Sequence, residues 1–113
     1  MPYTISQIYP DDRRGMVKVR ALLEGEGLSL DANLDYTCGL FDEEYRLAAT
    51  GSAFGATLRC FAVAREHQGE GLLNQVISHL IEYQAQRGVF HLFVYTKCAS
   101  AKFFADLGFY EIA

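Results

Sequence analysis

The sequence predicts an α+β fold with one mixed sheet, in which an antiparallel meander of strands is followed by a parallel strand pair. Two observations favour this fold. Three β-prone runs between residues 36 and 63 are separated only by short polar or glycine turns, which is typical of a meander. An apolar run, an amphipathic helical segment and a second apolar run then follow one another. That order predicts parallel strands joined by a right-handed crossover.

The first part of the chain predicts one strand and one helix. Residues 3–9 alternate and are rich in β-prone side chains, and Pro10 ends this strand. Asp11 or Asp12 can cap a helix that runs to about Glu26, because apolar residues recur there at helical spacing. We therefore expect a short strand followed directly by an amphipathic helix.

Residues 28–35 show no clear pattern of helix or strand, and the meander follows them. Its three strands are expected at residues 36–41, 45–52 and 57–63, with turns at 42–44 and 54–56.

The helix after Gly71 has the clearest pattern in the chain. Its apolar pairs repeat every four residues, and they are Leu72/Leu73, Val76/Ile77 and Leu80/Ile81. Gly88 is a plausible C-terminal stop. Residues 89–95 are apolar almost throughout, so we expect a strand covered on both faces, with His91 as a hydrogen-bonded core histidine.

The end of the chain predicts a second helix at residues 99–107 and a further strand at residues 109–113. Because the sequence stops within that strand, we interpret residues 1–113 as a single domain, the N-terminal part of a longer protein.

The composition excludes several classes of protein. The chain has 113 residues, half of them hydrophobic, and a formal net charge of −4, which disfavours nucleic acid and anionic membranes as partners. Its three cysteines are far apart and odd in number, as expected in a reducing cytoplasm. The histidines and cysteines lack the spacing of a metal site. No signal peptide and no membrane-spanning run is apparent.

A glycine turn, Gln68-Gly69-Glu70-Gly71, links the apolar run to the start of the amphipathic helix. A helix start presents backbone N–H groups without intrahelical partners, and glycine lets a ligand approach them, so this turn can bind a phosphate or pyrophosphate. On this pattern alone, a turn that merely packs the helix against the sheet is equally well supported.

Two motifs resemble the GNAT acetyltransferases. One is Val63-x-x-x-x-Gln68-Gly69-x-Gly71 leading into an amphipathic helix, and the other is the run from Ala101 to Phe109, which contains Leu-Gly-Phe. The resemblance implies that the turn holds the pyrophosphate of coenzyme A or acetyl-CoA, and that the pantetheine arm pairs with the strand at Val63. The cofactor-binding residues that it implies are Phe61, Val63, Gln68, Gly69, Glu70, Gly71, Leu72, Leu73 and Lys102.

Nearly the whole chain also resembles the N-terminal domain of the citrate lyase ligases. The resemblance is carried by the segments 26–31, 33–41, 57–60, 67–74 and 91–97. It implies a domain that helps to acetylate the thiol of the dephospho-CoA-like prosthetic group on the acyl carrier subunit of citrate lyase. It further implies that acetate and ATP are used by a nucleotidyltransferase domain following residue 113.

Two residues depart from the usual GNAT pattern. Glu66 stands where many members carry Gln or Arg, and Phe104 stands where many carry a tyrosine that protonates the departing thiolate. The catalytic residues therefore stay unassigned, and a domain that binds a pantetheine arm fits better than direct transfer from acetyl-CoA. The alternatives are a stand-alone acetyl-CoA-dependent N-acetyltransferase and a non-catalytic binding or interaction module.

Overall fold

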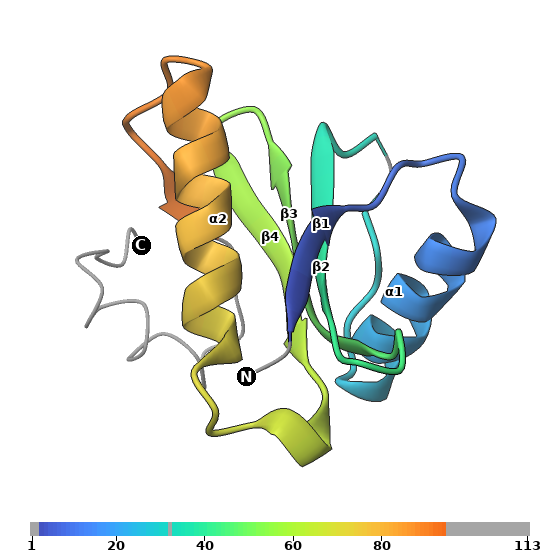
Figure 1. The fold of residues 1–113 in the computed structure, drawn as a ribbon. Coiled ribbons are helices and arrows are strands. Elements are labelled where there is room, and N and C mark those ends of the chain that lie inside the picture. Colours follow the sequence, from blue (N-terminus) through green and yellow to red (C-terminus); the bar gives the residue numbers. More distant parts are fainter. Residues whose placement is uncertain (1–2, 32, 95–113) are drawn as a thin grey trace.

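The computed structural model describes residues 3–31 and 33–94 (Figure 1). The helix expected at 99–107, the strand expected at 109–113, and the two residues Lys102 and Phe104 lie outside the described residues.

The described residues form a five-stranded sheet with a helix on each face (Figure 1), and the sheet is mixed, as the sequence predicted. The strands lie in the order β1-β2-β3-β4-β5; neighbours from β1 to β4 are antiparallel, and β4 and β5 are parallel. The strands are β1 (Thr4–Gln7), β2 (Tyr36–Phe41), β3 (Leu47–Phe54), β4 (Thr57–Val63) and β5 (Phe93–Val94). The helices are α1 (Arg13–Gly25), the short 3₁₀ helix η1 (Arg65–His67) and α2 (Leu72–Gln86).

Helix α1 begins and ends where the sequence predicted. The Asp12 carboxylate accepts a hydrogen bond of 3.0 Å from the backbone N–H of Gly15, which caps the helix start. Val19 and Leu23 are fully buried and form a hydrophobic cluster with Ile8 and Ala62 on one face of the sheet.

Helix α2 packs on the other face of the sheet through the repeated apolar pairs. Leu72, Val76 and Leu80 belong to the larger hydrophobic cluster, which also contains residues of β2, β3 and β4. The fully buried Gln84 donates a 2.8 Å hydrogen bond to the Gly55 carbonyl, so it ties α2 to the β3–β4 turn. This packing fixes the direction in which the start of α2 points.

Helix α2 ends in a Schellman motif at Gly88, as the sequence predicted. The Gly88 N–H bonds to the Ala85 carbonyl at 3.0 Å, and the Val89 N–H bonds to the Gln84 carbonyl at 2.9 Å. Gly88 has φ of 79°, a left-handed conformation that glycine adopts without strain.

A strand was predicted over residues 89–95, and the described part of it is a strand only at Phe93–Val94, where the expected burial on both faces is wrong. The Schellman motif turns the chain back, and pairing with β4 begins only at Phe93. Phe90 is 74% exposed and Phe93 is 49% exposed among the described residues, and His91 is exposed rather than in the core. An apolar run alone does not fix burial, because burial also depends on where the chain lies after it leaves α2.

The second of the three predicted meander strands, β3, begins two residues later than predicted, at Leu47. The Asp42 carboxylate accepts hydrogen bonds from the N–H groups of Glu44 and Arg46 and holds the preceding turn. Tyr45 lies within this turn with φ of 60°.

Candidate functional site

The glycine turn joins η1 to α2 at one end of the sheet. Gly69 and Gly71 have φ of 90° and 77°, so both positions need a residue that tolerates the left-handed region. A Cβ built on either glycine would meet nothing within 4 Å. The glycines are therefore present for backbone conformation and leave the turn open, because no neighbouring helix or strand of the described chain presses against them.

The start of α2 presents a continuous run of backbone N–H groups that have no partner among the described residues. The first N–H with an acceptor is that of Gln75, which bonds to the Gly71 carbonyl at 3.4 Å. The N–H groups of residues 69–74 have no acceptor in the described part of the chain, and Gly71 supplies no side-chain cap. These donors and the positive end of the helix dipole together suit an anion such as a pyrophosphate.

Some of the predicted site residues are exposed, and others have side chains that are buried in the core. Gly69, Glu70 and Gly71 are exposed, whereas the side chains of Phe61 and Leu72 are buried in the core. Leu72 therefore offers a ligand its N–H rather than its side chain.

Gln68 and Val63 contact each other in this structure. The Gln68 side chain donates a 3.2 Å hydrogen bond to the carbonyl of Val63, at the end of β4. The carbonyl that was expected to pair with a pantetheine arm is therefore covered by an exposed side chain. A ligand that pairs there must displace the Gln68 amide, which is held by this one bond.

A bulge in β4 lies beside the turn. Ala62 pairs with Thr50 and Arg59 pairs with Ser52, so Cys60 and Phe61 together oppose Gly51. Cys60 adopts φ of 58° at this bulge. The described part of β5 pairs only with Thr57 and Leu58, at the start of β4. The bulge bends the strand between its paired beginning and the end that leads into the turn.

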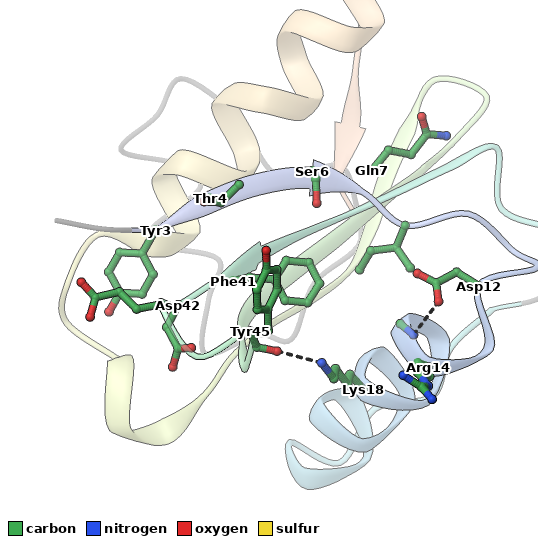
Figure 2. Close-up of a pocket in the computed structure, with 13 residues that line it drawn as sticks. Tyr3, Thr4, Ser6, Gln7, Asp12, Arg14, Lys18, Phe41, Asp42 and Tyr45 are labelled. Atoms are coloured by element: carbon green, nitrogen blue, oxygen red, sulfur yellow. Dashed lines mark hydrogen bonds between the residues drawn. The ribbon is translucent and has the colours of Figure 1, made fainter.

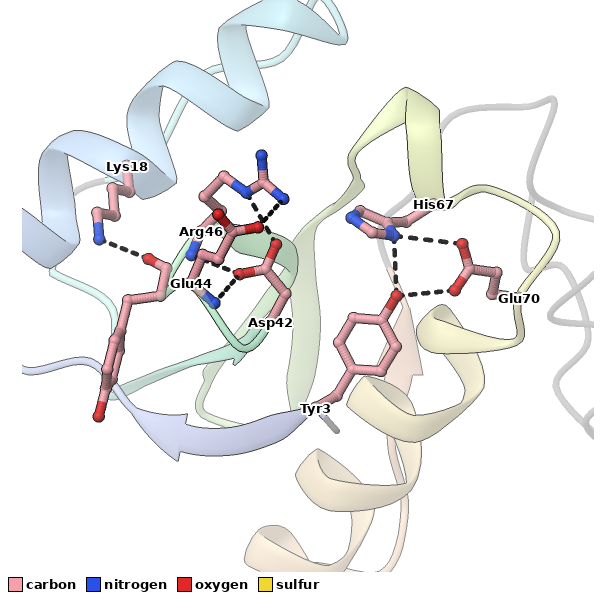
Figure 3. A network of polar contacts seen from close by, with 8 residues as sticks. Tyr3, Lys18, Asp42, Glu44, Arg46, His67 and Glu70 are labelled. Atoms are coloured by element: carbon pink, nitrogen blue, oxygen red, sulfur yellow. Dashed lines mark hydrogen bonds and ion pairs between the residues drawn. The ribbon is translucent and has the colours of Figure 1, made fainter. Parts of the chain in front are cut away.

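A cluster of three polar side chains at the turn was missed by the sequence reasoning (Figure 3). The hydroxyl of Tyr3 lies 2.7 Å from Glu70 Oε1 and 2.8 Å from His67 Nδ1, and Nδ1 lies 3.2 Å from Glu70 Oε2. The hydrogen bonds from Tyr3 and His67 hold the pKa of the Glu70 carboxyl below its usual value. No local pattern could reveal the cluster, because Tyr3 is 64 residues from His67 along the chain.

The described cysteines are poor candidates for nucleophiles. Burial raises the pKa of the Cys38 thiol to about 12 and also raises the pKa of Cys60. Among residues 3–31 and 33–94, no group of three His, Cys, Asp or Glu side chains could hold a metal ion.

A cavity of about 580 Å³ lies between β1, α1 and the β2–β3 turn, and its lining includes Tyr3, which also contacts Glu70 at the glycine turn (Figure 2). Lys18 donates to the Tyr45 carbonyl at 2.7 Å across this cavity and lies 5.7 Å from the centre of the Phe41 ring. Of the described residues implied by the GNAT resemblance, none lines the cavity.

The fold is that of the GNAT acetyltransferases. An acetyltransferase from Trypanosoma brucei superposes with a TM-score of 0.79 at 14% identity, covering 98% of this chain and 94% of that one. The mixed sheet with its parallel β4–β5 pair and the two helices match this fold. The predicted fold is therefore confirmed.

The chain is also homologous to the N-terminal part of the [citrate (pro-3S)-lyase] ligases. It is 33% identical to the enzyme from Klebsiella pneumoniae over 86 residues, which are 76% of this chain and 25% of that protein. It is 27% identical to the enzyme from Haemophilus influenzae over 104 residues, which are 90% of this chain and 30% of that protein. The chain thus spans less than a third of these relatives' length.

Similarity to ligases and acetyltransferases indicates an enzyme-type domain. A comparison with protein-family models finds none that matches the chain. No helix in the described part of the chain is long and apolar enough to cross a membrane.

Proposed function

We propose that this chain binds coenzyme A, or a dephospho-CoA-like prosthetic arm, through its glycine turn and assists acetyl transfer to the thiol of that arm. The observation that carries the proposal is the run of backbone N–H groups over residues 69–74, which have no acceptor in the described part of the chain. Six donors at the start of a 15-residue helix suit a pyrophosphate, the group that CoA and dephospho-CoA share.

The turn offers its donors from the main chain rather than from cations. The nearby Arg65 guanidinium pairs with Glu26 at 3.4 Å, and Arg46 pairs with Asp42 and Glu44. Among the described residues, the amides of the turn are therefore the donors that we propose for a pyrophosphate. Because CoA and a dephospho-CoA-like arm both carry a pyrophosphate, binding through these amides does not require the 3′-phosphate of CoA.

The chain's part in the reaction is to bind and orient the arm. The thiol attacks the carbonyl carbon of an activated acetyl group, a thioester forms, and the activating group leaves with the bonding electron pair. The described part of the chain supplies no activated cysteine for a covalent step. We assign activation of acetate by ATP to a separate nucleotidyltransferase domain, and we propose the acyl carrier subunit of citrate lyase as the partner, in the cytoplasm.

The two alternatives differ in the transfer step. A stand-alone N-acetyltransferase would acetylate an amine from acetyl-CoA, and the GNAT fold is compatible with that activity. A non-catalytic module would bind the arm and present it to another domain. The free amides at the turn support ligand binding in all three cases.

Calorimetry with CoA, dephospho-CoA and pantetheine tests the proposal. We expect CoA and dephospho-CoA to bind with similar affinity and pantetheine, which lacks the pyrophosphate, to bind much more weakly. Absence of binding by all three, or equal binding of pantetheine, would overturn the assignment. Acetylation of amines by the chain alone would instead favour the N-acetyltransferase.

A further inference from the structure

We infer that Tyr3 is a positioning residue of the cofactor turn, which holds the Glu70 carboxylate away from the free amides that bind the anion. This inference rests on the proposed function. Tyr3 lies near the N-terminus, 67 residues before Glu70 in the sequence. Its role in ligand binding is indirect, since it acts on Glu70 and does not contact the ligand.

Glu70 lies between the two glycines of the turn and directly precedes the residue that caps α2. A carboxylate at this place can compete with an anionic ligand, because it can turn toward the start of α2 and neutralise the positive end of the helix dipole. If it remained beside the amides, it would also repel a bound pyrophosphate. A turn that binds an anion must therefore keep this carboxylate elsewhere.

The structure shows where the Glu70 carboxylate is kept (Figure 3). Both of its oxygens are engaged, Oε1 with the Tyr3 hydroxyl at 2.7 Å and Oε2 with His67 Nδ1 at 3.2 Å. A carboxylate only accepts, so the hydroxyl of Tyr3 donates its single proton to Glu70. The 2.8 Å contact between Tyr3 and His67 then requires a proton on Nδ1.

Tyr3 is well placed for this role by the sheet. It directly precedes β1, whose pairing with β2 holds the strand in place, and its ring packs edge-on against His67 with 5.6 Å between the ring centres. The position of the hydroxyl is thus set by elements other than the turn. The side chain of His67 belongs to the segment between β4 and the turn, so it cannot supply the same external anchor.

A double-mutant cycle of Tyr3→Phe and Glu70→Gln tests whether Tyr3 affects ligand binding by positioning the Glu70 charge or by a general effect on the conformation of the turn. We expect Tyr3→Phe to weaken binding of dephospho-CoA by about three- to tenfold, the effect of one charge–charge contact at about 4 Å in water. Glu70→Gln should bind at least as tightly as the unaltered chain. Tyr3→Phe should then have no further effect in the Glu70→Gln background, because no charge remains to be positioned.

The control is Tyr9→Phe, since the Tyr9 side chain is 57% exposed and its hydroxyl makes no hydrogen bond in the described part of the chain. Thermal unfolding of each variant monitors the fold. Equal losses from Tyr3→Phe in both backgrounds, or unchanged affinity in the single variant, would overturn the inference and leave the proposed function standing. Failure of the unaltered chain to bind CoA and dephospho-CoA would overturn both.

Discussion

Substitutions at Gly69 and Gly88 distinguish an effect on anion binding from an effect on the stability of α2. Both have φ in the left-handed region, 90° and 79°, and a Cβ on either would meet nothing within 4 Å. They flank opposite ends of the same helix. Replacing each by alanine costs about 1–2 kcal/mol of backbone strain, which corresponds to a fall of roughly 4–8 °C in Tm for a domain of this size.

The two variants should differ in ligand binding. If the amides of the turn bind a pyrophosphate as proposed, a methyl group at Gly69 narrows the space in front of them, so we expect one or two charge-assisted hydrogen bonds to be lost. At about 1.5 kcal/mol or more each, this loss weakens binding of dephospho-CoA by roughly 10–100-fold. Gly88→Ala should leave the affinity unchanged. Calorimetry with dephospho-CoA measures the affinity of each variant. Equal affinities of Gly69→Ala and Gly88→Ala would refute binding through the turn amides.

Three further predictions concern the rest of the fold. Asp12→Ala removes the cap of α1 and should lower the free energy of unfolding by about 1 kcal/mol in a denaturant titration. The exposed Asp11 gives the control, Asp11→Ala, which should have little effect. Gln84→Leu keeps the volume but leaves a turn carbonyl without its donor, so it should cost about 1–3 kcal/mol in the same assay; an unchanged midpoint would contradict the role given to Gln84. The N–H groups and guanidinium of Arg46, with the N–H of Glu44, hold the pKa of the Asp42 carboxyl below its unfolded value. Its stabilising effect is therefore complete above the unfolded pKa and is lost as the pH falls through the lowered folded pKa. Asp42→Asn should flatten the acid side of the stability profile, and an unchanged profile would show that this turn is not the cause.

Local patterns were sufficient to predict strands β1 to β4 and the helices α1 and α2. The four-residue repeat from Leu72 to Leu80 and the glycines at its two ends determine where α2 lies, because each acts within a few residues of itself. The position of the glycine turn could be predicted for the same reason, since the glycines before a helix start are visible in the sequence.

Features that depend on distant contacts could not be predicted in this way. The contact of Tyr3 with Glu70 needs β1 to be placed beside the start of α2, which only the assembled sheet achieves. The exposure of Phe90 depends on how the chain leaves α2 rather than on its apolarity. The Gln68 bond to Val63 likewise follows from the course of the backbone between the two residues.

The most direct measurement is a titration of the ¹⁵N-labelled chain with dephospho-CoA, followed by the backbone amide resonances. The central claim is that residues 69–74 bind an anion through their N–H groups. We expect the largest chemical-shift changes at the amides of residues 69–74, with little change at the cavity residues Lys18 and Tyr45. Changes concentrated at that cavity, or none at residues 69–74, would contradict it.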